Sequence, residues 1–280
     1  MDKAKVNNIE IEYEVSGTGE PVLLISPVLA DGFVPLIEEG SLAERYQLIR
    51  YHKRGWAGST HPDGAVSVED HAADAAALLD HLGIPRAHVA GHSSGAAVAA
   101  QLALDDLDRV HTLTLLELSL LSVPAGQAFL DQAAPALEAY ATGHHEDALA
   151  MFLTAVSGMP WDECRTLLES RMPGTVVQAV KDAKTFFEVE LPGLAQWTFG
   201  DTEAAQIRRP TLSILGSDTA PLWVEVAEFL RTKTPYVEER TIIGVGHLLH
   251  LQQPAPVASA IAEFLDGNPL ATQDDNGPHA

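Results

Sequence analysis

Short apolar runs alternate with amphipathic segments along most of this chain. Residues 22–25 form a continuous apolar run that ends at Ser26-Pro27, the pattern of a buried strand. An alternating stretch over residues 6–14 predicts an antiparallel hairpin. Further apolar runs predict strands at 47–51, 87–90, 110–116, 211–215 and 238–243.

Helical patterns fall between or after these strands. The clearest helix begins near Ser67, whose hydroxyl can cap the first turn together with Asp70. It carries apolar side chains at Leu78, Leu79 and Leu82 and ends at a glycine. A strand followed by a helix, repeated, predicts an α/β fold in which helices cover both faces of a mostly parallel sheet.

One long segment breaks this alternation. Between about residues 121 and 209 the pattern contains no convincing strand, while apolar residues recur at helical spacing, as at Leu149, Phe152, Leu153 and Val156. We therefore predict a helical cap at 122–208 inserted into a core formed by 1–121 and 209–267. The polar, Pro- and Gly-containing tail at 268–280 is predicted to be disordered.

Composition narrows the classes of partner and compartment. The chain has 280 residues with 39 acidic and 17 basic side chains, and its formal net charge of -22 disfavours nucleic acid and anionic membranes. Its single cysteine, Cys164, allows no internal disulfide, which fits a reducing cytosol. The N-terminal residues lack the apolar run of a signal peptide and no window suggests a membrane span, so we expect a cytoplasmic protein.

The motif that most clearly indicates a catalytic residue is Gly91-His92-Ser93-Ser94-Gly95. A predicted strand precedes it and an Ala-rich helix follows, which is the setting in which a tight turn presents a nucleophilic serine. We predict Ser93 as the nucleophile. The backbone N–H of Ser94 is the expected first donor to an oxyanion, and that of Val28, in the loop after residues 22–25, is the expected second.

A base is predicted at His247, in the segment Gly244-Val245-Gly246-His247 directly after the last strand. This position gives the chain order serine, acid, histidine. His250 and His92 lack that position in a loop after a strand, so each is the weaker candidate.

These features, together with the turn at residues 54–59, resemble the α/β-hydrolase superfamily over roughly residues 6–266. In that superfamily the acid commonly follows the penultimate strand, at a slot that here holds Thr219. Two carboxylates remain as candidates: Asp218, one residue earlier, and Glu117, at the end of the strand at 110–116. We favour Glu117 because a buried glutamate at a strand end requires a partner such as His247.

An acid at Glu117 also resembles the zearalenone-type lactone hydrolases, in which a glutamate after the same strand is the acid and the elbow also reads Ser-Ser-Gly. The resemblance implies hydrolysis of an apolar ester or lactone, with no cofactor and no metal. In the predicted cap, Trp197 is the aromatic residue expected to line the substrate cavity.

Two other functions remain open at the level of sequence. One is carbon–carbon bond hydrolysis of a diketone, which uses the same triad but needs polar residues for a substrate carboxylate. The other is a ligand-binding protein that retains the triad without turnover. The oligomeric state is also open, with a homodimer as one alternative.

Overall fold

The computed structural model describes residues 1–270, and its centre is an eight-stranded sheet in the order β1-β2-β4-β3-β5-β6-β7-β8. The strand β2 runs antiparallel to β1 and β4, and every other neighbouring pair is parallel. The predicted α/β class is therefore confirmed. The strands are β1 Asp2–Val6, β2 Ile9–Ser16, β3 Glu20–Ile25, β4 Tyr46–Tyr51, β5 Ala87–His92, β6 Val110–Leu116, β7 Thr211–Gly216 and β8 Val237–Ile242.

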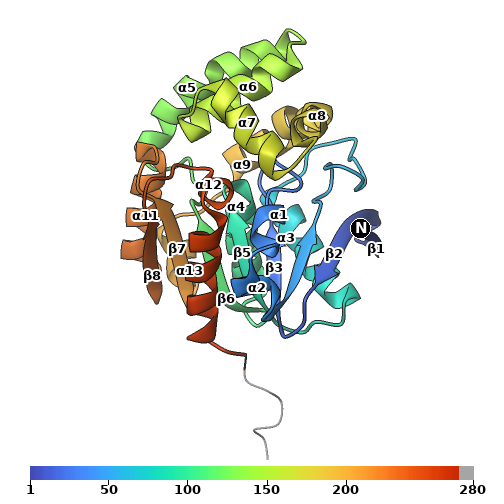
Figure 1. Ribbon diagram of the computed structural model, residues 1–280, viewed down its shortest axis with the longest axis vertical. Coiled ribbons are helices and arrows are strands. Elements are labelled where there is room, and N and C mark those ends of the chain that lie inside the picture. Colours follow the sequence, from blue (N-terminus) through green and yellow to red (C-terminus); the bar gives the residue numbers. More distant parts are fainter. Residues whose placement is uncertain (271–280) are drawn as a thin grey trace, which may run out of the picture.

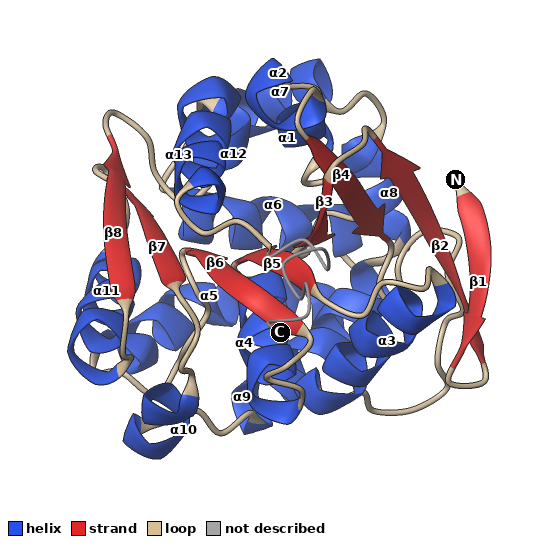
Figure 2. Cartoon of the chain, turned by 90° about the horizontal axis from the view of Figure 1, so that it is seen from below, coloured by secondary structure: helices blue, strands red, loops and turns tan. Residues whose placement is uncertain are grey.

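Helices cover both faces of the sheet because its central strands are apolar on both sides. One face packs against α3, α4 and α11, and the other against α1, α2, α12 and α13 (Figure 2). These helices are α1 Val34–Ile37, α2 Gly40–Ala43, α3 Val68–His81, α4 Ser94–Asp105, α11 Pro221–Lys233, α12 Leu249–Gln252 and α13 Pro254–Asp266.

Local signals in the sequence explain two of these elements. The Ser67 hydroxyl accepts the Asp70 N–H at 3.1 Å while the Asp70 carboxylate accepts the Ser67 N–H, so α3 begins with the predicted capping box. The N-terminal hairpin is longer than predicted and spans residues 2–16. Its turn falls at Asn7 and Asn8, whose φ angles of 47° and 63° suit asparagine.

Only helices occupy the chain between β6 and β7, within the segment where the pattern favours helices. They are α5 Ala125–Ala141, α6 His145–Ser157, α7 Trp161–Arg171, α8 Thr175–Lys181, the π-helix η1 Thr185–Glu190, α9 Leu191–Gln196 and α10 Asp201–Gln206. Those from α5 to η1 share an apolar cluster that includes Phe152 and Phe186 and also contains Trp56 and Leu248 of the sheet-bearing part. Figure 1 shows α5 to α9 above the end of the sheet at which the site described below lies, whereas α10 lies beside the C-terminal end of α11, where Asp201 pairs with Lys233.

The C-terminal segment beyond α13, for which we predict disorder from residue 268, begins beside β6. The ring Nε2 of His111 lies 3.0 Å from the backbone carbonyl oxygens of both Asn268 and Pro269, so these two residues are held against β6. The remainder of the predicted disordered tail, residues 271–280, lies outside the described residues. Among the helices that the structure describes, none is long and apolar enough to cross a membrane.

Candidate active site

Three of the predicted site residues meet at one edge of the sheet. Ser93 directly follows β5, Glu117 directly follows β6, and His247 lies in the loop after β8. Because these strands are parallel, their carboxyl ends share this edge, where ligands of open α/β sheets bind.

Ser93 occupies a sharp turn between β5 and α4. Its φ of 55° and ψ of −120° lie outside the regions that most side chains adopt, so the turn is strained. Glycines on either side allow the strand and helix to approach. A Cβ at Gly91 would lie 2.3 Å from the Gly95 carbonyl oxygen, and one at Gly95 would lie 2.1 Å from that of Ile25. This packing is the physical reason for the spacing of the two glycines around Ser93.

The side chains of Glu117, His247 and Ser93 form a hydrogen-bonded chain. His247 Nδ1 lies 2.7 Å from Glu117 Oε2, and His247 Nε2 lies 3.1 Å from Ser93 Oγ. A carboxylate can only accept, so Nδ1 carries the proton and Nε2 offers a lone pair to the serine hydroxyl. This is the geometry that a general base and its nucleophile require.

Both carboxylate oxygens of Glu117 accept hydrogen bonds, although the side chain is buried. Its Oε1 accepts the Gly216 N–H at 2.9 Å, and its Oε2 accepts the Thr219 hydroxyl at 2.9 Å in addition to His247. These bonds offset the desolvation of the carboxylate. The threonine that occupies the usual acid slot thus supports the glutamate on the neighbouring strand.

Asp218, the alternative acid, is not brought to His247. Its side chain is exposed and accepts the hydroxyl of Ser217 at 2.7 Å, while its backbone N–H bonds to Val245. The structure therefore pairs Glu117 with the histidine.

Ser94 and Val28 line the same cavity as Ser93. As the first residue of α4, Ser94 has no helical carbonyl four residues earlier to accept its N–H. The positive end of the helix dipole also lies at this residue.

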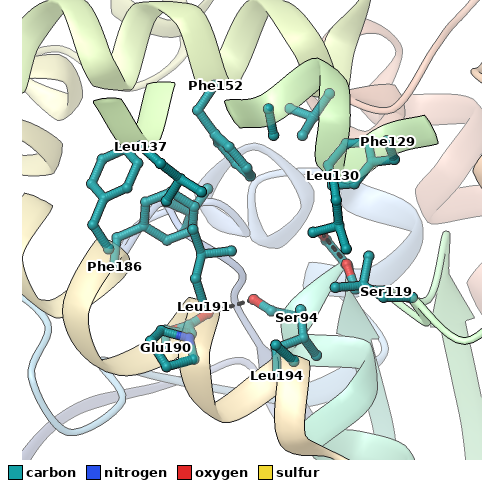
Figure 3. Close-up of a pocket in the computed structure, with 18 of the residues that line it drawn as sticks. Ser94, Ser119, Phe129, Leu130, Leu137, Phe152, Phe186, Glu190, Leu191 and Leu194 are labelled. Atoms are coloured by element: carbon teal, nitrogen blue, oxygen red, sulfur yellow. Dashed lines mark hydrogen bonds between the residues drawn. The ribbon is translucent and has the colours of Figure 1, made fainter. Parts of the chain in front are cut away.

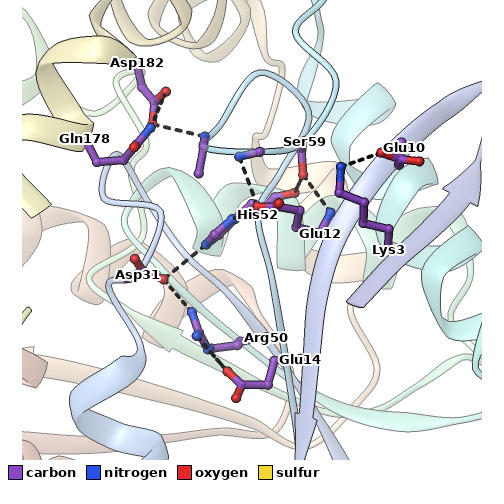
Figure 4. A network of polar contacts seen from close by, with 12 residues as sticks. Lys3, Glu10, Glu12, Glu14, Asp31, Arg50, His52, Ser59, Gln178 and Asp182 are labelled. Carbon is purple, nitrogen blue, oxygen red and sulfur yellow. Dashed lines mark hydrogen bonds and ion pairs between the residues drawn. The ribbon is translucent and has the colours of Figure 1, made fainter. Parts of the chain in front are cut away.

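The loop that carries Val28 is tied to β4 through Asp31. The Asp31 carboxylate accepts Arg50 Nη1 at 2.5 Å and lies 3.1 Å from His52 Nε2, within the polar network of Figure 4. The hydrogen bond with His52, reinforced by Arg50, lowers the pKa of Asp31 to about 2. The loop is consequently held by an ionised carboxylate at neutral pH.

Aromatic rings surround His247. Its imidazole stacks on the Trp223 indole, with ring centroids 3.9 Å apart and an angle of 8° between the planes. On another side lies His92, whose Nε2 donates to the His247 backbone carbonyl at 2.9 Å, and beyond it His250, 4.2 Å from His92 between centroids. Burial lowers the pKa of His250 to about 3 and that of His92 well below its usual range. Both of these neighbours are therefore neutral at physiological pH.

The cavity in front of Ser93 has a volume of about 250 Å³ and is mostly apolar. Helices α5, α6 and α9 supply much of its wall (Figure 3). Among the described residues that line it, none is Lys, Arg or His. Its polar side chains are those of Ser93, Ser94, Ser119 and Glu190, and it is also lined by Trp223, whose indole N–H has no hydrogen-bond partner among the described residues.

Sequence reasoning missed two of these polar side chains. The Ser119 hydroxyl lies 3.0 Å from Ser93 Oγ, and its position two residues after Glu117 was the available signal. Glu190 of η1 accepts the Ser94 hydroxyl, as Figure 3 shows, and pairs with Lys53 at 2.8 Å. No local pattern relates Lys53 to Glu190, because the contact joins segments far apart in the chain.

The prediction for Trp197 is wrong for this cavity. The indole lies at the end of α9, where Trp197 Nε1 donates to Gln101 Oε1 of α4 at 2.8 Å and the ring stacks on Phe199. This buried hydrogen bond turns the ring toward α4, so that Leu194 and Ala195 line the cavity instead.

Cys164 lies buried within the helical segment, in agreement with its interpretation as a packing residue. Burial raises the pKa of its thiol to about 11, so it is an unreactive thiol at neutral pH. Within residues 1–270, no group of three or more His, Cys, Asp or Glu side chains is arranged to hold a metal ion.

Comparison with known proteins agrees with this geometry. The model of the alpha/beta hydrolase fold family matches residues 21–254. The chain belongs to this family. It is therefore a hydrolase of the α/β-hydrolase fold, and the carboxylate that lies beside His247 follows β6.

One relative of this α/β hydrolase is named for the hydrolysis of carbamates. RutD of Azorhizobium caulinodans, named for carbamate hydrolysis, is 37% identical over 118 residues, which are 41% of this chain and 43% of that protein. The match thus spans less than half of the length of that relative.

Two solved structures share the fold over nearly the whole chain. An esterase from Thermogutta terrifontis has a TM-score of 0.76 and 24% identity, covering 95% of this chain and 98% of its own. The enol-lactonase from Burkholderia xenovorans LB400 has a TM-score of 0.74 and 19% identity, covering 95% and 100%.

Proposed function

We propose that this α/β hydrolase cleaves a carboxylic ester or lactone of a neutral, apolar substrate through an acyl-enzyme. The observation that carries the proposal is the chain from Glu117 through His247 to Ser93, which ends at an apolar cavity. The structural likeness to an esterase and to an enol-lactonase is consistent with it.

In the proposed reaction, His247 Nε2 takes the proton of Ser93 as Oγ attacks the carbonyl carbon. The N–H groups of Ser94 and Val28 hold the oxyanion, and Glu117 stabilises the imidazolium. The imidazolium then protonates the leaving alkoxide. A water, deprotonated by His247, hydrolyses the acyl-enzyme and releases the carboxylic acid.

The lining of the cavity favours this reaction over carbon–carbon bond hydrolysis. A substrate that carries a carboxylate needs a cation or several donors, and no Lys, Arg or His is among the described lining residues. An uncharged ester or lactone needs neither. Carbon–carbon hydrolysis is therefore the weaker alternative.

The test is turnover of p-nitrophenyl butyrate together with labelling by a fluorophosphonate. We expect hydrolysis and covalent labelling, both lost in Ser93→Ala, with kcat lowered by about three orders of magnitude or more. The matched control is Ser170→Ala, an exposed serine on α7 that should leave both readouts unchanged. A wild-type protein that neither labels nor turns over any activated ester would refute the proposal and favour a ligand-binding role.

A further inference from the structure

Glu190 is the one ionisable side chain among the described residues that line the cavity. It reaches the cavity from η1 and is only 5% exposed. Its Oε1 accepts both Lys53 Nζ at 2.8 Å and the Ser94 hydroxyl, and its Oε2 accepts Trp56 Nε1 at 2.8 Å. Burial of a carboxylate in an apolar wall carries a desolvation penalty unless the group is paired, so the presence of Glu190 there suggests a role in binding.

The pair of Glu190 and Lys53 carries no net charge. The Lys53 side chain is 2% exposed and lies behind Glu190, outside the wall of the main cavity. Whether the proton resides on the amine or on the carboxyl group, the two groups together sum to zero. The pair therefore adds polarity to the cavity without attracting an ionic substrate.

Among the groups that line the cavity, Glu190 and the Ser94 hydroxyl bonded to it leave free hydrogen-bonding capacity as acceptors. The Ser94 hydroxyl donates its hydrogen bond to Glu190, so its oxygen can act only as an acceptor toward a ligand. Glu190 Oε2 receives one hydrogen bond, from Trp56, and a carboxylate oxygen can accept a second. The remaining wall consists mainly of apolar side chains such as Leu191 and Phe186. An acceptor in such surroundings favours a ligand that brings a donor.

We propose that Glu190 and the Ser94 hydroxyl form a specificity site that selects esters or lactones bearing a hydroxyl or N–H group on the portion that fills the cavity. This inference rests on the proposed esterase or lactonase activity and names its substrate class. An analogue without the donor would enter the same apolar cavity but leave the acceptors unpaired, which lowers its transition-state binding.

The experiment compares pairs of esters in which a terminal hydroxyl replaces a terminal methyl group. One series places this change on the acyl chain of p-nitrophenyl esters, and a second places it on the alcohol of butyrate esters. We expect the wild type to prefer the hydroxyl-bearing member by about tenfold or more in kcat/KM in one series, at a chain length that spans the distance from Ser93 to Glu190.

The double variant Lys53→Met/Glu190→Leu removes both charges together and leaves no unpaired ion. Its preference ratio should fall toward one. Ser94→Ala keeps the backbone N–H and should lower the ratio less, and it supplies the test if the double variant does not fold. Because the readout is a ratio of two substrates in one protein, a general loss of activity does not move it.

The outcomes separate this inference from the proposed function. The specificity site alone is overturned if the wild type hydrolyses esters with a preference ratio near one in both series. It is also overturned if the folded double variant keeps the wild-type ratio. If the double variant does not fold, the same result in Ser94→Ala overturns it. Absence of hydrolysis for every ester, together with absence of labelling at Ser93, overturns the proposed function instead.

Discussion

The indole of Trp223 lies flat against the imidazole of His247, 3.9 Å away between ring centroids. Trp223 also contacts Phe129 of α5 and lines the cavity, so it joins the histidine to the helical wall. An aromatic face favours a neighbouring cation and limits rotation of the ring that it covers. The stack is thus suited to the imidazolium that forms during the reaction.

Trp223→Ala should lower kcat/KM for p-nitrophenyl butyrate by about tenfold to a hundredfold, because the imidazole loses its positioning partner. Trp223→Phe, which keeps an aromatic face, should recover most of this loss. Val224→Ala, at the exposed neighbouring position, is the control for α11. Full activity in Trp223→Ala would show that Glu117 alone orients the ring.

The identity of the acid can be tested with a matched pair of amides. Glu117→Gln should lower kcat by about three to four orders of magnitude, since the amide cannot stabilise the imidazolium. Asp218→Asn should stay within about threefold of wild type, because Asp218 is exposed and bonds to Ser217. A larger loss in Asp218→Asn than in Glu117→Gln would make our assignment wrong.

The carboxylate that partners His247 can be moved from position 117 to position 219 by mutation. The Thr219 hydroxyl lies 2.9 Å from Glu117 Oε2, which itself lies 2.7 Å from His247 Nδ1, so a carboxylate at position 219 has the histidine within reach. We expect Glu117→Ala/Thr219→Asp to exceed Glu117→Ala by about tenfold or more in kcat. Thr219→Asn in the same background supplies the side-chain shape without the charge and should give no recovery.

Stability should depend on pH through His250. Burial lowers its pKa in the folded protein from 6.5 to about 3, so above pH 6.5 the ring is neutral in both states and contributes no pH dependence. As the pH falls below 6.5, the His250 imidazole binds a proton in the unfolded chain but stays neutral in the folded protein. The free energy of unfolding should therefore fall by up to about 1.4 kcal/mol per pH unit from this residue.

His250→Phe removes that contribution and keeps a ring beside Phe33 and His92. In urea titrations between pH 6 and pH 4, we expect the variant to show a shallower decline in stability than the wild type, by about 1 kcal/mol per pH unit. His81→Phe, at an exposed position on α3, is the control. Parallel declines in His250→Phe and wild type would mean that the folded protein protonates this ring.

Local signals were sufficient to predict Ser93 and His247. The glycines around Ser93 reflect contacts within one turn, and His247 lies in the loop after β8, which spans 237–242 against the predicted 238–243. Glu117 required one further step, the reasoning that a buried carboxylate at a strand end must have a partner. All three residues could be placed in one site because each follows a strand, and the carboxyl ends of parallel strands lie at the same edge of the sheet.

The wall of the cavity could not be predicted in the same way. Trp197 and Glu190 lie seven residues apart in one helical stretch, yet the first faces α4 and the second faces the cavity. Which face of a short helix points inward depends on its packing against distant segments, and the π-helical turn of η1 changes the register. The pairing of Glu190 with Lys53 is likewise a tertiary contact that neither local sequence indicates.

The absence of cations from the described lining of the cavity has a consequence for the end of the catalytic cycle. The proposed reaction turns an uncharged ester into an acid that ionises at neutral pH, and an anion is poorly solvated among apolar side chains. The buried Glu190–Lys53 pair carries no net charge and offers the anion no compensation, and the net charge of -22 adds a salt-screened repulsion outside. The acid should thus leave readily, and we expect weak inhibition by product even at high conversion.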